Sequence, residues 1–137
     1  MLRAAIQLTT RVLVAGVVFV VAALVPVSAS AAAGPTRITL TAQELGNDST
    51  FTTAVLTCDP VGGTHPTAGT ACALLTEAAG AVEDVPTQDP HAVCPFIWRP
   101  VGVTATGLWQ GRPVAFSKTF PNDCVLRSEL GALFDIR

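Results

Sequence analysis

The chain has 137 residues, half of them hydrophobic, and a formal net charge of −2 at pH 7. This mildly acidic balance provides no basic patch, so nucleic acid is not expected as a partner. The length is enough for one domain and no more.

The N-terminal segment has the features of a secretory signal peptide. Arg3 and Arg11 supply positive charge, residues 12–27 are almost entirely apolar, and small residues follow. We therefore predict a signal peptide at residues 1–31, cut between residues 29 and 33. A retained membrane anchor is the alternative, but 16 apolar residues fall short of the roughly 20 that span a bilayer.

Cleavage would leave a secreted, extracellular domain of residues 32–137 with a net charge near −4 and no membrane attachment. All the cysteines lie in this part: Cys58, Cys72, Cys94 and Cys124. An even number in a small secreted domain predicts two disulfides, although spacing alone allows three connectivities. A zinc site is the competing interpretation, but there is no C-x-x-C pair and only His65 and His91 could assist. We expect no metal and no cofactor.

The first elements of the mature domain form a predicted β-hairpin. Residues 36–42 and 50–58 alternate polar and apolar side chains, and the turn signal Gly-Asn-Asp at 46–48 separates them. Residues 59–69 contain three glycines and two prolines, so we expect no regular structure there.

A helix is predicted next, from Thr70 as its N-cap through Ala79, with Gly80 ending it. Its apolar side chains follow helical spacing and should pack on a sheet: Ala71, Leu74, Leu75 and Ala78.

Residues 83–98 are expected to be irregular, since Pro86, Pro90 and Pro95 remove amide donors and fix φ. Two alternating segments, 101–106 and 114–118, then predict a hairpin with a long turn at 107–111.

The C-terminal part predicts a second helix at 123–130 that ends near Gly131. Residues 133–137 are predicted to form a short closing strand, with Leu133 or Phe134 and Ile136 available to the core. The sum is an α+β domain: an antiparallel sheet of about five strands, two short helices on one face, and two disulfides.

Between residues 58 and 75, the residue types and their spacing resemble those of the Streptomyces subtilisin inhibitor family of secreted serine protease inhibitors. The matching positions are Cys58, Pro60, Gly63, His65, Pro66, Ala71, Cys72 and Leu75. The resemblance continues through G-x-W-x-G at 107–111 and T-F-x-N-x-C at 119–124. His65 is interpreted as a structural residue of the His-Pro corner and not as a catalyst.

The stretch C-P-F-I-W at 94–98 resembles the protease-binding loop of that family. Three large apolar residues between prolines are typical of an exposed binding patch, although a packed core segment is the alternative. The resemblance assigns the loop to Val93, Cys94, Pro95, Phe96, Ile97 and Trp98, with Phe96–Ile97 as the reactive bond. It also assigns Asn122 as the residue that supports the loop from beneath.

The resemblance further implies the pairs Cys58–Cys72 and Cys94–Cys124, and we expect the second to tie the loop to the sheet. It implies a substrate-like inhibitor of extracellular subtilisin-like and chymotrypsin-like serine proteases, and a homodimer formed through sheet faces. Trp98, Arg99 and Pro121 depart from the residues common in the family, so Arg99 is expected to influence which proteases bind and Pro121 to stiffen or tilt Asn122.

Two other classes of function were weighed against this one. An enzyme is not expected, because Ser117, Ser128, His65 and His91 form no recognisable catalytic constellation. A secreted or cell-surface binding domain with the same fold and no protease inhibition is the remaining alternative.

Overall fold

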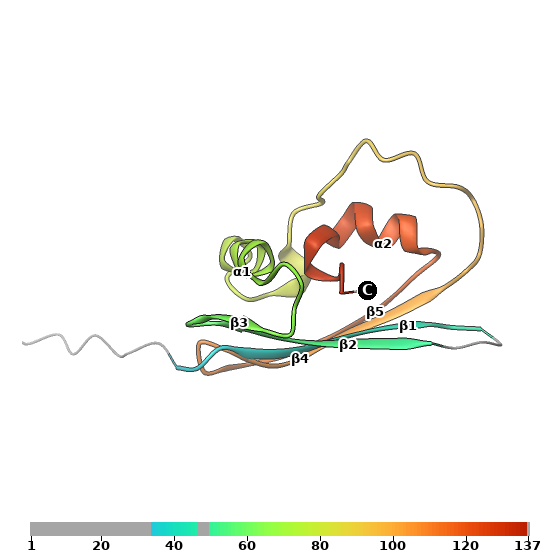
Figure 1. Ribbon diagram of the computed structural model, residues 1–137. Coiled ribbons are helices and arrows are strands. Elements are labelled where there is room, and N and C mark those ends of the chain that lie inside the picture. Colours follow the sequence, from blue (N-terminus) through green and yellow to red (C-terminus); the bar gives the residue numbers. More distant parts are fainter. Residues whose placement is uncertain (1–33, 47–49, 137) are drawn as a thin grey trace, which may run out of the picture. The chain divides into compact units, whose positions relative to one another are not determined.

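A computed structural model describes residues 34–46 and 50–136 of the chain (Figure 1). The predicted signal peptide and the predicted turn residues Asn47 and Asp48 lie outside the described residues. Within the described part, no helix is long and apolar enough to cross a membrane.

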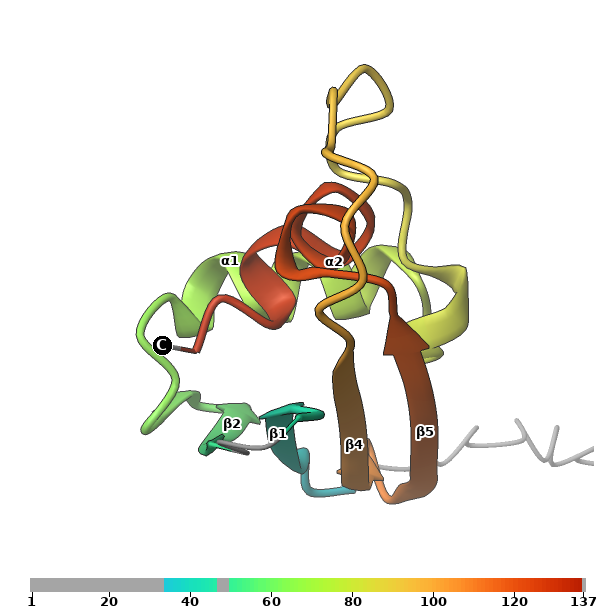
Figure 2. The same cartoon turned by 90° about the vertical axis from the view of Figure 1, so that its right-hand side faces the viewer.

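Five strands form one antiparallel sheet in the order β3-β2-β1-β4-β5. The strands are β1 (Arg37–Glu44), β2 (Phe51–Cys58), β3 (Val61–Gly63), β4 (Val101–Trp109) and β5 (Arg112–Phe120). Helices α1 (Ala68–Glu77) and α2 (Asp123–Leu130) lie on one face of the sheet, as Figures 1 and 2 show. The predicted α+β class, with five strands and two helices, is confirmed.

The core lies between this face and the helices, as the period-2 pattern of the strands requires. Alternate strand residues point inward and are fully buried, among them Ile38, Leu40, Leu56 and Val103. The helices contribute Ala71, Leu75, Leu126 and Leu130, and Phe120 closes the end of β5. The predicted apolar face of α1 therefore packs on the sheet, with Leu74 only partly buried.

Residues 59–69 contain more structure than predicted. Val61–Gly63 forms β3, which pairs with Leu56–Cys58 across a tight turn, and α1 begins at Ala68. Gly63 allows a close approach of two strands, because a Cβ there would lie 2.1 Å from the Val55 carbonyl oxygen.

Thr70 does not cap α1; the N-cap residue is Thr67, and its side chain makes no capping hydrogen bond. The Thr67 N–H is instead satisfied by His65 Nδ1 at 3.1 Å. The helix ends at Glu77, two residues before the predicted end. Ala79 has the positive φ, 51°, that commonly follows a helix end, and the N–H of Gly80 donates to the Leu75 carbonyl at 2.7 Å.

The β4–β5 connection is a two-residue turn, not the long turn predicted. Gln110 and Gly111 both have positive φ, 49° and 80°, which is the geometry of the tightest hairpins. Gly107, taken from sequence as part of the turn, lies within β4. A Cβ there would lie 2.1 Å from the Arg37 carbonyl oxygen, so this glycine allows β1 to approach.

Helix α2 has the predicted bounds, with Gly131 directly after it at φ +46°. The predicted closing strand is wrong for its described residues: Gly131–Leu133 is a 3₁₀ turn, η2, and residues 134–136 are irregular, while Arg137 lies outside the described residues. Leu133, Phe134 and Ile136 are all buried, but they pack over the core from above the sheet and have no neighbouring strand to pair with.

Candidate functional site

The segment between α1 and β4 carries the candidate site. After a short 3₁₀ turn, η1 (Val82–Asp84), the chain is irregular up to β4 and passes over α2 (Figure 2). Its four prolines, Pro86, Pro90, Pro95 and Pro100, deprive it of amide donors, so it cannot join the sheet as an inner strand. The prediction that residues 83–98 are largely irregular is confirmed, apart from η1.

The large apolar side chains of residues 93–98 lie exposed to solvent. Phe96 is fully exposed, Val93 is 97% exposed and Trp98 74% exposed. Ile97 is about half exposed. The alternative that Phe96 is a packed core residue is therefore wrong, and the loop presents a continuous apolar surface of the kind that marks binding sites.

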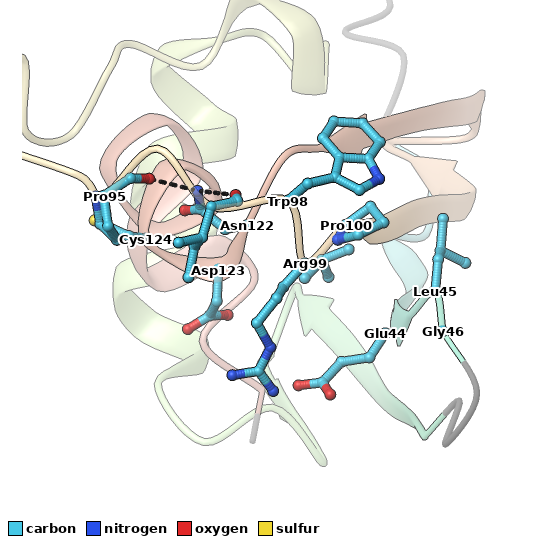
Figure 3. A pocket seen from close by; sticks show the side chains of 12 residues that line it. Glu44, Leu45, Gly46, Pro95, Trp98, Arg99, Pro100, Asn122, Asp123 and Cys124 are labelled. Carbon is cyan, nitrogen blue, oxygen red and sulfur yellow. Dashed lines mark hydrogen bonds between the residues drawn. The ribbon is translucent and has the colours of Figure 1, made fainter.

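Asn122 lies beneath the loop and is 4% exposed. Its Nδ2 donates to the carbonyl oxygens of Pro95 and Ile97, at 3.1 Å each (Figure 3). These carbonyls belong to the residue before Phe96 and to the residue after the Phe96–Ile97 bond. One amide group therefore holds the backbone on both sides of that bond.

The orientation of this amide is fixed by α2. Asn122 is the N-cap residue of the helix, and its Oδ1 accepts from the Val125 N–H at 3.0 Å. An Asn at an N-cap is favourable because it satisfies an otherwise free amide of the first turn. Since the oxygen faces the helix, the nitrogen faces the loop.

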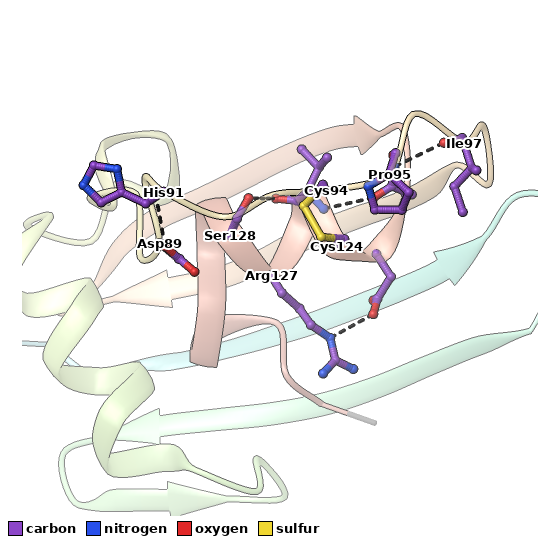
Figure 4. The surroundings of a disulfide bond; sticks show 11 residues. Asp89, His91, Cys94, Pro95, Ile97, Cys124, Arg127 and Ser128 are labelled. Atoms are coloured by element: carbon purple, nitrogen blue, oxygen red, sulfur yellow. Dashed lines mark hydrogen bonds and ion pairs between the residues drawn. A yellow bond between two sulfur atoms is a disulfide. The ribbon is translucent and has the colours of Figure 1, made fainter.

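The disulfide Cys94–Cys124 holds the loop just before Pro95, with a Cα–Cα distance of 5.6 Å (Figure 4). The predicted pairing of all four cysteines is confirmed, since Cys58–Cys72 is the other bond. The anchor of the loop differs from the expectation, however. Cys124 lies in the first turn of α2, so the bond ties the loop to the helix and not to the sheet.

Backbone hydrogen bonds hold the rest of the segment. Before the loop, the Asp89 N–H donates to the Ser128 carbonyl of α2 at 2.9 Å. After it, the Arg99 N–H donates to the Pro121 carbonyl at 2.9 Å, and the Pro100 carbonyl accepts from Leu45 at 2.8 Å. Pro121 thus contributes its carbonyl to the loop, while Asn122 still makes two bonds of equal length.

Sequence reasoning missed the roles of Pro121 and Leu45, because a backbone contact between distant segments leaves no local pattern. The ion pair of Asp123 with Arg127, 2.8 Å, could have been predicted from its i,i+4 spacing on α2. It lies at the surface of the helix that carries the loop and contributes little on its own.

His65 is a structural residue, as predicted. It is 6% exposed, and its Nε2 lies 3.1 Å from the Leu133 carbonyl oxygen, which joins the start of α1 to η2. Within the described residues, no group of three or more His, Cys, Asp or Glu could hold a metal ion.

The sequence matches the subtilisin inhibitor-like family over residues 34–122. It is 38% identical to a subtilase-type protease inhibitor of Streptomyces fradiae, over 90% of this chain and 94% of that protein. It is 35% identical to a subtilisin inhibitor of Streptomyces albogriseolus, over 77% of this chain and 75% of the other.

Among solved structures, the fold is similar to Streptomyces caespitosus sermetstatin, crystallised in complex with Bacillus licheniformis subtilisin. The TM-score is 0.62 at 32% sequence identity, covering 74% of this chain and 99% of the other.

Proposed function

The chain belongs to the subtilisin inhibitor-like family, and we propose that it inhibits extracellular serine proteases of the subtilisin type by presenting the Phe96–Ile97 bond to them. The family is one of protease inhibitors, and the chain is not an enzyme. One observation carries the proposal: the Phe96 side chain is fully exposed, while Asn122 holds the carbonyls on either side of the adjacent bond.

Binding would follow the way a protease takes a substrate. A protease binds an extended peptide as an added strand, and side-chain pockets supply specificity. Phe96 would fill the primary pocket, with Val93 and Trp98 exposed on either side of it. Because the loop is already fixed by its disulfide and by Asn122, little conformational entropy remains to be lost, which raises affinity.

Restraint also explains why such a substrate would not be consumed. The serine oxygen of the protease attacks the Phe96 carbonyl carbon, the bond to Ile97 breaks, and the Ile97 nitrogen leaves as an amine. The Ile97 side stays in place through the Arg99 and Pro100 backbone bonds, and the Phe96 side through Cys94–Cys124. The amine can therefore attack the acyl-enzyme ester again and expel the serine, since positioned groups react at very high effective concentration.

Titration of subtilisin with purified mature protein tests this proposal. We expect loss of activity at close to one chain per enzyme, measurable inhibition of chymotrypsin and poor inhibition of trypsin, whose pocket prefers a cation. Prolonged incubation should yield an inhibitor heavier by one water molecule. Reduction of its disulfides should release two fragments, one ending at Phe96 and the other beginning at Ile97. Strong inhibition of trypsin beside weak inhibition of subtilisin would contradict the assignment of Phe96. No inhibition at all would favour a binding domain with the same fold.

The uncovered face of the sheet supports the proposed homodimer. The registers place Thr39, Thr41, Thr53, Thr104, Thr106 and Ser117 on this face. Among the described residues of β1, β2, β4 and β5 that share the face, Arg37 alone is charged. A surface with so little charge suits a second copy of the chain, because a two-fold interface brings the same patch together from both subunits.

Secretion is part of the same proposal. The mature N-terminus should lie between residues 29 and 33, which mass spectrometry of the exported protein would establish. The two disulfides are consistent with an oxidising compartment, where such bonds form and persist.

A further inference from the structure

The reactive loop is small compared with a stable protein interface. Specific complexes bury about 800 Å² on each partner, contributed by roughly 20–30 residues a side. The loop from Val93 to Trp98 offers six residues. A tight complex at this loop must therefore involve neighbouring surface.

Two surfaces adjoin the loop. On the side that precedes Phe96, the depression is lined by Asp89, Arg127 and Ser128 together with Ala92 and the Cys124 end of the disulfide. On the side that follows Ile97, a groove of about 580 Å³ includes Leu45, Gly46, Trp98, Arg99 and Pro100 in its walls. Only the second carries large exposed apolar side chains, Leu45 and Trp98.

Leu45 is fixed relative to the loop although it is distant in sequence. Its N–H donates to the Pro100 carbonyl at 2.8 Å, directly after β1 ends. Its side chain lies against Gly102 of β4, where a Cβ would be 3.5 Å from Leu45 Cδ1. The side chain nevertheless remains 41% exposed. In Figure 3, Pro100 lies between Trp98 and Leu45.

The charged residues of the groove leave this apolar surface free for contact. Figure 3 shows Arg99 directed toward Glu44 on the opposite wall. The Arg99 side chain thus points away from Trp98, Pro100 and Leu45, although it is itself exposed.

We propose that Leu45 and Pro100 extend the protease-binding loop beyond Trp98 as a second contact surface, the leaving-group surface, for the same protease that binds Phe96–Ile97. The partner of this surface would be an apolar part of the protease, next to the subsites that bind the residues after the reactive bond. The inference rests on the proposed function, and the continuity of this surface with the reactive loop selects the protease as its partner.

Inhibition constants for subtilisin test the proposal, with Leu45→Asp and Leu45→Ala compared with wild type. Leu45→Asp should weaken inhibition roughly tenfold or more, and Leu45→Ala less, because apolar contact is lost and a charge is desolvated. Val61→Asp is the matched control: Val61 is an exposed apolar residue on β3, which Figure 1 places at the opposite end of the sheet. It should change the constant about twofold or less.

A photo-crosslinking residue at position 45 provides a readout that does not depend on affinity. It should couple to subtilisin, whereas the same residue at position 61 should not. If Leu45→Asp inhibits as well as wild type and no cross-link forms, the proposal of the leaving-group surface is wrong. The proposed function would still stand in that case, because the wild type inhibits subtilisin. Absence of wild-type inhibition would reject both. If sedimentation shows that Leu45→Asp only dissociates a dimer, the surface belongs to a second copy, and the proposal is wrong.

Discussion

At the scale of single residues, Asn122 uses both halves of one amide. Its oxygen caps α2 through Val125, and its nitrogen holds the carbonyls of Pro95 and Ile97. A substitution to Ala removes both functions and cannot tell them apart. Serine keeps an N-cap oxygen but is too short to reach two loop carbonyls, so it separates the helix from the loop.

We therefore expect Asn122→Ser and Asn122→Ala to be hydrolysed by subtilisin at Phe96–Ile97 equally fast, within hours, where the wild type persists. Affinity should fall modestly in both, in line with about 1 kcal/mol of lost local order. The free energy of unfolding should be about 1 kcal/mol higher for the serine variant than for the alanine variant. Cleavage followed by mass spectrometry, and denaturant unfolding, give the two readouts. If Asn122→Ala resists cleavage as well as wild type, the supporting role of Asn122 is wrong.

Phe96→Lys should redirect inhibition toward trypsin without affecting the fold. Phe96 is fully exposed, so no cavity forms and the unfolding free energy should change by about 0.5 kcal/mol or less. A lysine ammonium pairs with the buried carboxylate of the trypsin pocket, which phenyl leaves unpaired. The measurement is a pair of inhibition constants, for trypsin and chymotrypsin, in wild type and variant. A ratio that fails to invert would mean that the reactive bond lies elsewhere.

At the scale of elements, α2 carries the loop. The loop segment runs antiparallel to α2 and the two residues before it: Arg99 bonds to Pro121, Cys94 to Cys124 and Asp89 to Ser128. The helix is in turn seated on the sheet by Leu126 and Leu130. Most anchors of the loop thus lie on one short helix and the residues just before it, and Leu45 after β1 supplies another.

This arrangement predicts different consequences for the two disulfides. Replacing Cys94 and Cys124 by Ser frees the loop from α2, so cleavage at Phe96–Ile97 should accelerate strongly. Replacing Cys58 and Cys72 should leave the loop intact and lower stability. The chain-entropy model gives about 3 kcal/mol for the separation of 14 residues and about 4 kcal/mol for that of 30. Equal cleavage rates in the two double variants would contradict the distinct role of Cys94–Cys124.

Glycines of two kinds allow a further prediction about the elements. In β4, Gly107→Ala places a methyl group on the Arg37 carbonyl and should destabilise the fold by about 2 kcal/mol or more. Gly69 lies in α1 with nothing within 4 Å of its would-be Cβ, so Gly69→Ala should be neutral or stabilising by up to about 1 kcal/mol. Unfolding in denaturant compares them, and similar values for both would refute the close approach of β1 and β4.

Local sequence signals predicted much of the fold but not its long-range details. The alternation in β1 and β2, the helical spacing of the apolar residues in α1 and the terminal glycine of α2 were sufficient, because these features act within a few residues. Gly107 was predicted to be a turn residue. In the sequence, a glycine required by a turn looks the same as one required by the approach of β1, which lies about 70 positions earlier. The apolar residues of the C-terminal segment predict that it packs on the core. Whether it also pairs as a strand depends on a neighbouring strand, which the sequence does not reveal.

The candidate site divides in the same way. The prolines and the apolar residues 96–98 lie close together in the sequence, and this local pattern predicted an exposed loop. The role of α2 as the anchor and the contact of Leu45 with Pro100 were not predictable, because they depend on how the sheet brings the end of β1 beside the start of β4.

At the scale of the whole molecule, the inhibition and the dimerisation that we propose would use different parts of one chain. The loop and all its described anchors, from Leu45 to Ser128, belong to a single subunit. The helices cover the inner face of the sheet, while the threonine-rich outer face is left for a partner. A monomeric variant should therefore still inhibit.

Thr104→Glu tests this separation, because Thr104 lies on the outer face of β4 between Thr41 and Ser117. Two copies of the new carboxylate near a two-fold axis would repel each other and remain poorly solvated, so the dimer should dissociate. Thr70→Glu, on the exposed side of α1, is the control and should remain dimeric. Sedimentation equilibrium gives the mass, and subtilisin titration should still show one enzyme bound per chain for both variants. A wild type that is monomeric at micromolar concentration would refute the dimer, and a monomeric Thr104→Glu that folds but no longer inhibits would show that the loop depends on the partner subunit.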